Sequence, residues 1–254
     1  MPLFSYRLIK LVGQVIKGAD NGLFIFDYCS FVFCLVLLRF VQRDKTLLAI
    51  FLLLLIIMIT NPTASEVIKQ ATLLAHASTE KALIKHIKSI RTPQQYALLL
   101  GCMYGYFEPL EKQLDSYLDN VVDNYNQRRK AGRLLDDIRS LNQPDPKQFA
   151  DQLPSVTNTT EAMACFYVLE GSILGGAVIK KIISGQAVSI PAASFSFFSG
   201  YQDKTMEVWR AFLQQFNAHI QSQEQLQQAI DAANVCFEKL GDWINIYYSR
   251  VSPT

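Results

Sequence analysis

The chain has 254 residues and a formal net charge of +2, which is enough length for one large domain or two small ones. Its basic residues are scattered and lack the basic stripe with interleaved aromatics of a nucleic-acid-binding protein, so we expect no nucleic-acid partner. Five cysteines form no CxxC pair, and an odd, widely spaced set argues against a disulfide framework or a zinc site. We expect buried thiols in a reducing compartment, hence a cytoplasmic protein.

The N-terminal 60 residues are more hydrophobic than the rest of the chain. They contain two apolar runs, 28–38 and 47–59, separated by the basic link RFVQRDK. Each run is shorter than the roughly 20 residues of a membrane-spanning helix. One interpretation is a tilted membrane hairpin, which would make the protein membrane-associated if residues 1–57 are translated. The favoured interpretation is a misassigned start codon, with Met58 as the true start. We therefore expect a hydrophobic extension over 1–60 and a helical domain over 61–254.

Beyond residue 60, apolar residues recur with helical spacing, and no alternating segment or Asn-Gly hairpin signal occurs. The pattern predicts an all-α domain of seven or eight helices. Thr63 or Ser65 caps the first helix, Thr92 caps the second with Pro93 at its first position, and Pro109 should kink or break that second helix. The predicted helices cover residues 65–88, 93–120, 132–142, a segment beginning after residue 158, 203–220, and 222 to about 248.

The stretch YVLEGSILGGAVIKK, residues 167–181, has helical spacing but contains three glycines. Each glycine costs a helix interior about 1 kcal/mol relative to alanine. Gly171 and Gly175 lie at i and i+4, which opens a groove on one helix face, and Gly176 widens it. The groove accommodates either a closely packed neighbouring helix or a ligand, and both interpretations remain open.

Of the three histidines, His86 lies among lysines and His219 at a helix end, so both are expected at the surface. His76 lies in mid-helix, on one stripe with Lys69 and Glu80. The Glu80 carboxylate, at i+4, can accept a hydrogen bond from one imidazole nitrogen and leave the other for a metal. The Glu-x-x-His pairs of a di-iron centre are absent. A single histidine and a glycine-rich helix fit a flat ligand held between two helices, such as haem.

Several segments resemble the biliverdin-producing haem oxygenase family in its bacterial form. IKQATLLAH…E is similar to the family's proximal helix, and YVLEGSILGG resembles its distal-helix signature. Further matches follow in the family's order and extend over about residues 66–244: TPQQYALLLGCMYGYFEPLE, RRKAGRLLDDI, FFSGYQDKTMEVWRAF and AANVCFEKLGDWI. The resemblance implies a multi-helical haem oxygenase-like bundle.

The resemblance also implies a role for each candidate residue. His76 would be the axial ligand of the haem iron, with Glu80 as its hydrogen-bond partner. A distal wall would face the other side of the haem, formed by Gly171, Ser172, Gly175 and Gly176. Cations that neutralise haem propionates would be Lys69, Arg210, and Lys180 or Lys181. Two residues depart from the family pattern: Ser172 stands where some members have aspartate, and Leu73 where many have a basic residue.

The implied reaction uses haem as both cofactor and substrate, with O₂ and electrons from an external donor such as a ferredoxin or flavodoxin-type protein. Its products are biliverdin, carbon monoxide and ferrous iron, and a biliverdin-using phytochrome is a further partner that the resemblance suggests. Two alternatives stay open. One is a non-catalytic haem-binding or haem-sensing protein on the same fold. The more remote one is a non-haem enzyme on this scaffold, similar to thiaminase-like relatives.

Overall fold

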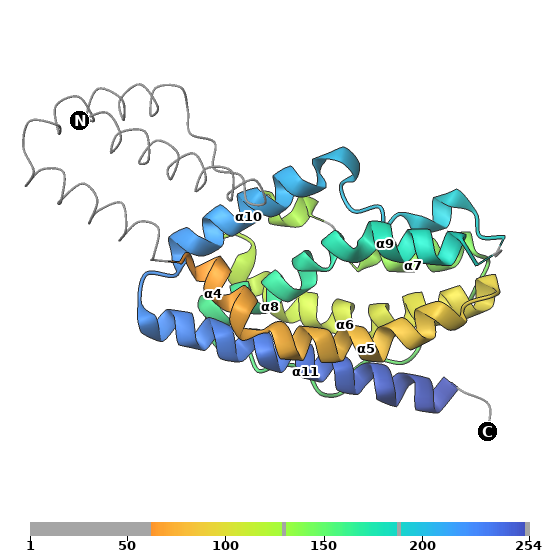
Figure 1. Ribbon diagram of the computed structural model, residues 1–254, viewed down its shortest axis with the longest axis horizontal. Coiled ribbons are helices and arrows are strands. Elements are labelled where there is room, and N and C mark those ends of the chain that lie inside the picture. The colour runs from red at the N-terminus through yellow and green to blue at the C-terminus, as the bar shows by residue number, and fades with distance from the viewer. Residues whose placement is uncertain (1–61, 129–130, 187–188, 252–254) are drawn as a thin grey trace, which may run out of the picture. The chain divides into compact units, whose positions relative to one another are not determined.

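The computed structural model describes residues 62–128, 131–186 and 189–251, and these ranges contain helices and loops but no strand (Figure 1). The predicted all-α fold is therefore confirmed, while the expected extension over 1–60 lies outside the described residues. The α-helices are α4 (Ala64–Ala71), α5 (Leu73–Ser89), α6 (Pro93–Leu118), α7 (Gly132–Ser140), α8 (Thr159–Gly171), α9 (Ile173–Ser184), α10 (Thr205–His219) and α11 (Gln223–Val251). Short 3₁₀ helices are η1 (Tyr125–Gln127), η2 (Ala192–Phe195) and η3 (Gln202–Lys204).

The first predicted helix is divided in two at Thr72. Thr63 caps α4 through a capping box with Glu66, as the local sequence predicts. Thr72 leaves helical geometry at φ −101° and ψ 2°, and its hydroxyl donates to the carbonyl of Ile68 at 2.8 Å. A threonine hydroxyl that bonds to the preceding turn competes with the helix ladder and bends the chain. The prediction of one continuous helix over 65–88 is therefore wrong.

Helix α6 continues through Pro109, so of the predicted kink or break the break does not occur. Proline has no N–H, which leaves the carbonyl of Gly105 without its helical donor. The N–H of Ala150 donates to that carbonyl at 2.8 Å. Gly105 permits this approach, because a Cβ atom there would lie 2.5 Å from the carbonyl oxygen of Gln148. The proline-rich loop after α7 thus satisfies the group that Pro109 exposes.

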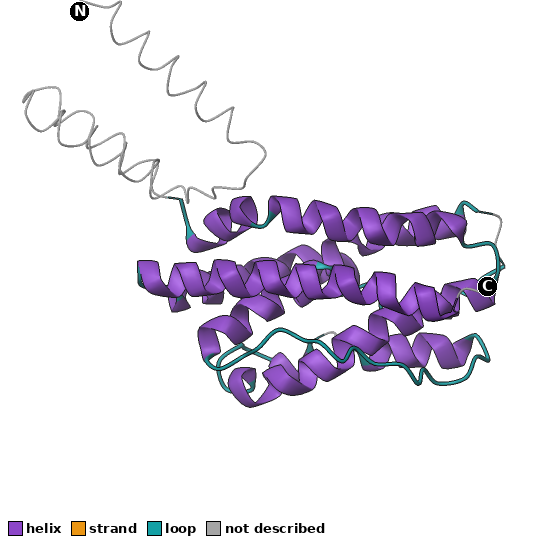
Figure 2. Ribbon diagram, turned by 90° about the horizontal axis from the view of Figure 1, so that it is seen from below, coloured by secondary structure: helices purple, strands orange, loops and turns teal. Residues whose placement is uncertain are grey.

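Helix α8 forms the centre of the bundle and packs against α6, α10 and α11. The described helices run roughly along one direction (Figure 2). The segment Thr159–Ser184 is apolar enough to span a membrane by composition, but 56% of its most apolar window is buried in the bundle, as expected of a core helix. Cys102, Cys165 and Cys236 are free and buried, in agreement with the thiol prediction.

The glycine-containing helix is also divided, at Ser172, so that Gly171 ends α8 and Gly175 lies in the first turn of α9. Glycine costs less near a helix end than in a helix interior, which reduces the conformational cost expected from the sequence. The last two helices agree with their predictions to within a few residues. Helix α10 begins at Thr205 because η3 precedes it, and α11 extends to Val251.

Candidate functional site

Helices α5 and α9 run in the same direction along one side of the bundle (Figure 1). Their C-terminal ends are joined by the side chain of Gln186, which donates to the carbonyls of Ile87 and Ile90 at 3.2 and 3.0 Å. His76 and Gly175 each lie eleven residues before a residue of this contact, Ile87 and Gln186 respectively. Because α5 and α9 both lead up to this contact, we expect His76 and Gly175 at similar levels along the two helices.

The other end of the same side is also joined. The N–H of Ser65, in α4, donates to the side-chain oxygen of Asn217 in α10 at 2.8 Å. His76 therefore lies between two fixed crossings, one from α4 to α10 and one from α5 to α9. Neither crossing covers it, because half of its side chain is exposed. This arrangement leaves the imidazole accessible on a rigid helix, which is what an axial ligand requires.

The His76 ring is supported from behind by α11. It lies edge-on to the Phe237 ring, with centroids 5.1 Å apart. Phe237 is in turn held by its carbonyl, which accepts a hydrogen bond from the Thr79 hydroxyl at 2.8 Å. His76 Nε2 and Glu80 Oε1 are 3.7 Å apart, so the hydrogen bond expected from their spacing is not formed in this conformation.

Apolar side chains are exposed on both helices near this level. On α5, Leu73 is 48% exposed, and on α9 Leu174 and Val178 are 44% and 60% exposed. Residues 174, 175 and 178 share one face of α9, because residues 173, 176 and 183 are buried on the other. An accessible histidine on one helix and exposed apolar side chains on its neighbour suit a flat, largely apolar ligand with a metal at its centre.

The three glycines have different surroundings. A Cβ atom at Gly175 would have no neighbour within 4 Å, so this position is open. A Cβ atom at Gly176 would lie 2.3 Å from the carbonyl oxygen of Phe198, and one at Gly171 would lie 3.4 Å from the Trp209 ring. The two explanations of the glycine pattern therefore apply to different residues. Close packing explains Gly176, and open space remains at Gly175.

The polar candidates are less concentrated than the sequence implies. The Ser172 hydroxyl donates to the carbonyl of Leu169 at 2.6 Å. Lys180 donates to the Ser199 hydroxyl at 3.3 Å and lies over the Phe195 ring, so it points towards the segment before α10. Three candidate cations, Lys69, Lys181 and Arg210, are exposed. No group of three or more His, Cys, Asp or Glu side chains in the described residues could hold a metal ion without a porphyrin.

The family model described as heme oxygenase matches residues 62–245. The chain belongs to the haem oxygenase family. A curated relative named heme oxygenase, from Xanthomonas campestris pv. campestris (strain 8004), is 28% identical over 143 residues, which are 56% of this chain and 84% of that protein. The fold is similar to that of the NO- and CO-bound heme oxygenase from Neisseria meningitidis, with a TM-score of 0.63, 19% identity, and coverage of 74% of this chain and 94% of that one. Family membership implies a haem-binding enzyme of this kind.

Within this haem oxygenase fold, the other two histidines differ from expectation. His86 is half-buried and stacked on the Tyr248 ring, and its Nε2 atom is buried without a hydrogen-bond partner among the described residues. Burial, with a contribution from Lys85, lowers the pKa of His86. His219 shares a hydrogen bond with the Thr160 hydroxyl at 3.0 Å, and burial lowers its pKa as well. The prediction that both histidines lie at the surface is therefore wrong, because each is partly buried.

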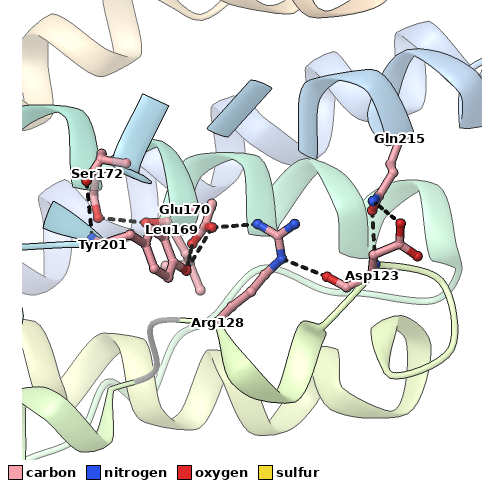
Figure 3. Close-up of polar contacts among 8 residues, drawn as sticks. Asp123, Arg128, Leu169, Glu170, Ser172, Tyr201 and Gln215 are labelled. Carbon is pink, nitrogen blue, oxygen red and sulfur yellow. Dashed lines mark hydrogen bonds and ion pairs between the residues drawn. The ribbon is translucent and has the colours of Figure 1, made fainter. Parts of the chain in front are cut away.

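Sequence reasoning missed a buried polar cluster around Glu170, at the end of α8 (Figure 3). The Glu170 carboxylate accepts a hydrogen bond from Arg128 Nη1 at 2.7 Å and from the Tyr201 hydroxyl at 3.0 Å. The Glu170 side chain is 1% exposed and that of Arg128 is 5% exposed. The available signal was an acidic residue inside an otherwise apolar helix, which in a native fold requires a partner.

Proposed function

We propose that this protein is a haem oxygenase that opens the haem ring at a meso carbon, with release of biliverdin, carbon monoxide and ferrous iron. The reaction would consume O₂ and electrons from an external donor such as a ferredoxin or flavodoxin-type protein. Two observations support the proposal: His76 on α5 is half-exposed, and a Cβ atom at Gly175 on α9 would have no neighbour within 4 Å. A flat ring between these helices would have a nitrogen ligand on one side and bare backbone on the other.

On the proximal side, His76 would hold the iron through one imidazole nitrogen. Phe237 fixes the ring edge, so the imidazole needs little reorganisation on binding. Glu80 is within reach of a hydrogen bond to the other nitrogen after a small side-chain rotation, since the present separation is 3.7 Å. Such a bond fixes the tautomer of the imidazole and raises its basicity as a ligand.

On the distal side, haem supplies the iron at which O₂ is reduced and the ring carbon that is oxidised. The protein side chains nearest to Gly175 on the same face of α9 are apolar, Leu174 and Val178. Neither can donate a proton, whereas a distal histidine or arginine would favour cleavage of the O–O bond, as in peroxidases. The open position at Gly175 would instead offer backbone groups and space for ordered water.

At the edge of the site, exposed cations would bind the haem propionates. Lys69, Lys181 and Arg210 are free to reorient because they lie at the surface. Lys180 would first have to leave the Ser199 hydroxyl, so it is a weaker candidate in the present conformation. Ser172 would contribute through its hydroxyl only after release from the Leu169 carbonyl. The biliverdin that is released would pass to a phytochrome that uses it.

The test is turnover of haem bound to the purified protein. With ascorbate or a ferredoxin and its reductase, and with catalase present to remove free peroxide, the Soret band should decay while biliverdin absorbance grows. Carbon monoxide should be released in an equal amount. A stable ferric or ferrous haem complex that forms no biliverdin under these conditions would instead identify a non-catalytic haem-binding or haem-sensing protein.

A further inference from the structure

One side of the α8–α9 segment is held by one loop. We call residues 196–201 the support loop. It contacts the segment at three points along its length: Tyr201 donates to Glu170, the Phe198 carbonyl lies against Gly176, and Ser199 accepts from Lys180. The contact at Gly176 is so close that a Cβ atom would lie 2.3 Å from a backbone oxygen. Gly175 and Gly176 are consecutive, so the support loop meets α9 about 100° around the helix from the open position at Gly175.

The support loop is itself fixed by α7. The buried Asp137 carboxylate accepts hydrogen bonds from the N–H groups of Ser196 and Phe197, at 3.0 and 2.9 Å. Arg133 donates to the carbonyl of Gly200 at 2.8 Å, and Gly200 adopts a positive φ of 55°. A loop with several backbone groups bonded to buried or half-buried charged side chains has little freedom to shift.

The third element of this arrangement is the ion pair between Arg128 and Glu170 (Figure 3). The Arg128 guanidinium lies beside two adjacent aromatic rings, 5.9 Å from the centroid of Phe166 and 5.8 Å from that of Phe212. Its Nε atom donates to the carbonyl of Asp123 at 3.2 Å. Because a buried ion pair is tolerated only with satisfied hydrogen bonds, its geometry is tightly constrained. Glu170 is consequently fixed from two directions, by Arg128 and by Tyr201.

We propose that Tyr201 and Glu170 are positioning residues for the distal side of the haem site, an inference that rests on the proposed function. Glu170 is covalently joined to Gly171, so the carboxylate that Tyr201 and Arg128 hold determines where the backbone of Gly171 and Ser172 lies. That backbone turns the chain from α8 into α9 and thereby sets the space above the haem. The proposal gives neither side chain a contact with haem. Both act through the backbone that they anchor.

The experiment replaces Tyr201 by phenylalanine, which removes one hydroxyl and leaves the Arg128–Glu170 pair intact. Tyr117→Phe is the matched control, because its hydroxyl donates to the carbonyl of Val156 and is not part of the cluster. For each haem-loaded protein, the measurements are the C–O stretching band of the ferrous carbon monoxide complex, the ratio of biliverdin isomers, and the melting temperature. The carbon monoxide band reports the distal environment without any turnover.

Tyr201→Phe should shift or split the C–O band and change the isomer ratio at least twofold, while Tyr117→Phe should leave both as in the parent protein. If Tyr201→Phe keeps the C–O band and the isomer ratio of the parent protein, the proposal is overturned, whatever the change in melting temperature. If Tyr201→Phe fails to fold, Asp137→Asn provides the comparison, because it loosens the support loop that carries Tyr201 and leaves the Arg128–Glu170 pair intact. A shifted band in a protein whose parent forms no biliverdin would refute the proposed function and retain the positioning role.

Discussion

The neighbouring glycines Gly175 and Gly176 allow a matched test of what each one does. Replacing a helical glycine by alanine stabilises the helix by up to about 1 kcal/mol, and less near a helix end. At Gly175 the new Cβ atom meets nothing within 4 Å, so we expect the haem-free protein to gain about 0.5 kcal/mol. At Gly176 the Cβ atom would lie 2.3 Å from the carbonyl oxygen and 3.1 Å from the carbonyl carbon of Phe198. Overpacking against backbone costs about 3 kcal/mol, so we expect a net loss of about 2 kcal/mol.

Urea unfolding of the haem-free variants measures this difference, with the slope compared to confirm that the unfolded states match. Haem titration and turnover then separate the roles. Gly175→Ala should be at least as stable as the parent but bind haem about tenfold more weakly, equivalent to about 1.4 kcal/mol. Gly175→Leu should fold and lose turnover. Equal stability changes at Gly175 and Gly176 would refute the packing assignment, and full turnover in Gly175→Leu would refute the distal-wall assignment.

Three further variants test other parts of the site and the fold. His76→Ala should lose the histidine-ligated haem spectrum and turnover, with recovery of the spectrum on addition of imidazole; an unchanged spectrum would contradict the axial assignment. Burial lowers the pKa of His219, so the folded state binds fewer protons than the unfolded state below the ordinary value of 6.5. The contribution of neutral His219 to the free energy of unfolding is therefore fully present above that value and is lost as the pH drops towards the folded pKa. His219→Gln should consequently lose less stability than the parent between about pH 7 and pH 5. Identical pH profiles would show that another group is responsible. Thr79→Val removes the hydrogen bond to the Phe237 carbonyl and should cost about 1–2 kcal/mol in urea unfolding; no measurable loss would mean that this bond does not hold Phe237 against His76.

Features that depend on neighbouring residues could be predicted from the sequence. The capping box of Thr63 and Glu66 and the start of α6 at Thr92–Pro93 are formed by residues a few positions apart. The break at Thr72 was local too, but a threonine within a helix is compatible with either continuation or bending. The sequence pattern alone therefore could not decide between them.

Features that depend on distant residues could not be predicted in this way. The continuation of α6 through Pro109 relies on the N–H of Ala150, which local rules cannot place next to Gly105. The partner of Glu170 is Arg128, 42 residues earlier in the chain. The sequence indicates only that a buried acid needs a partner, and the fold selects it from the available cations.

The glycine-rich segment shows why a family signature cannot be assigned to one role. Gly176 admits the backbone of the support loop on one face of α9, while Gly175 leaves another face open. The two faces are separated by one residue, so any displacement of the support loop is transmitted directly to the position of Gly175. Under the positioning proposal, α7 and the Arg128–Glu170 pair would set the clearance above a ligand held against Gly175. Selection on oxygen chemistry would then act on residues such as Asp137 and Tyr201, which lie behind the wall and do not touch the ligand.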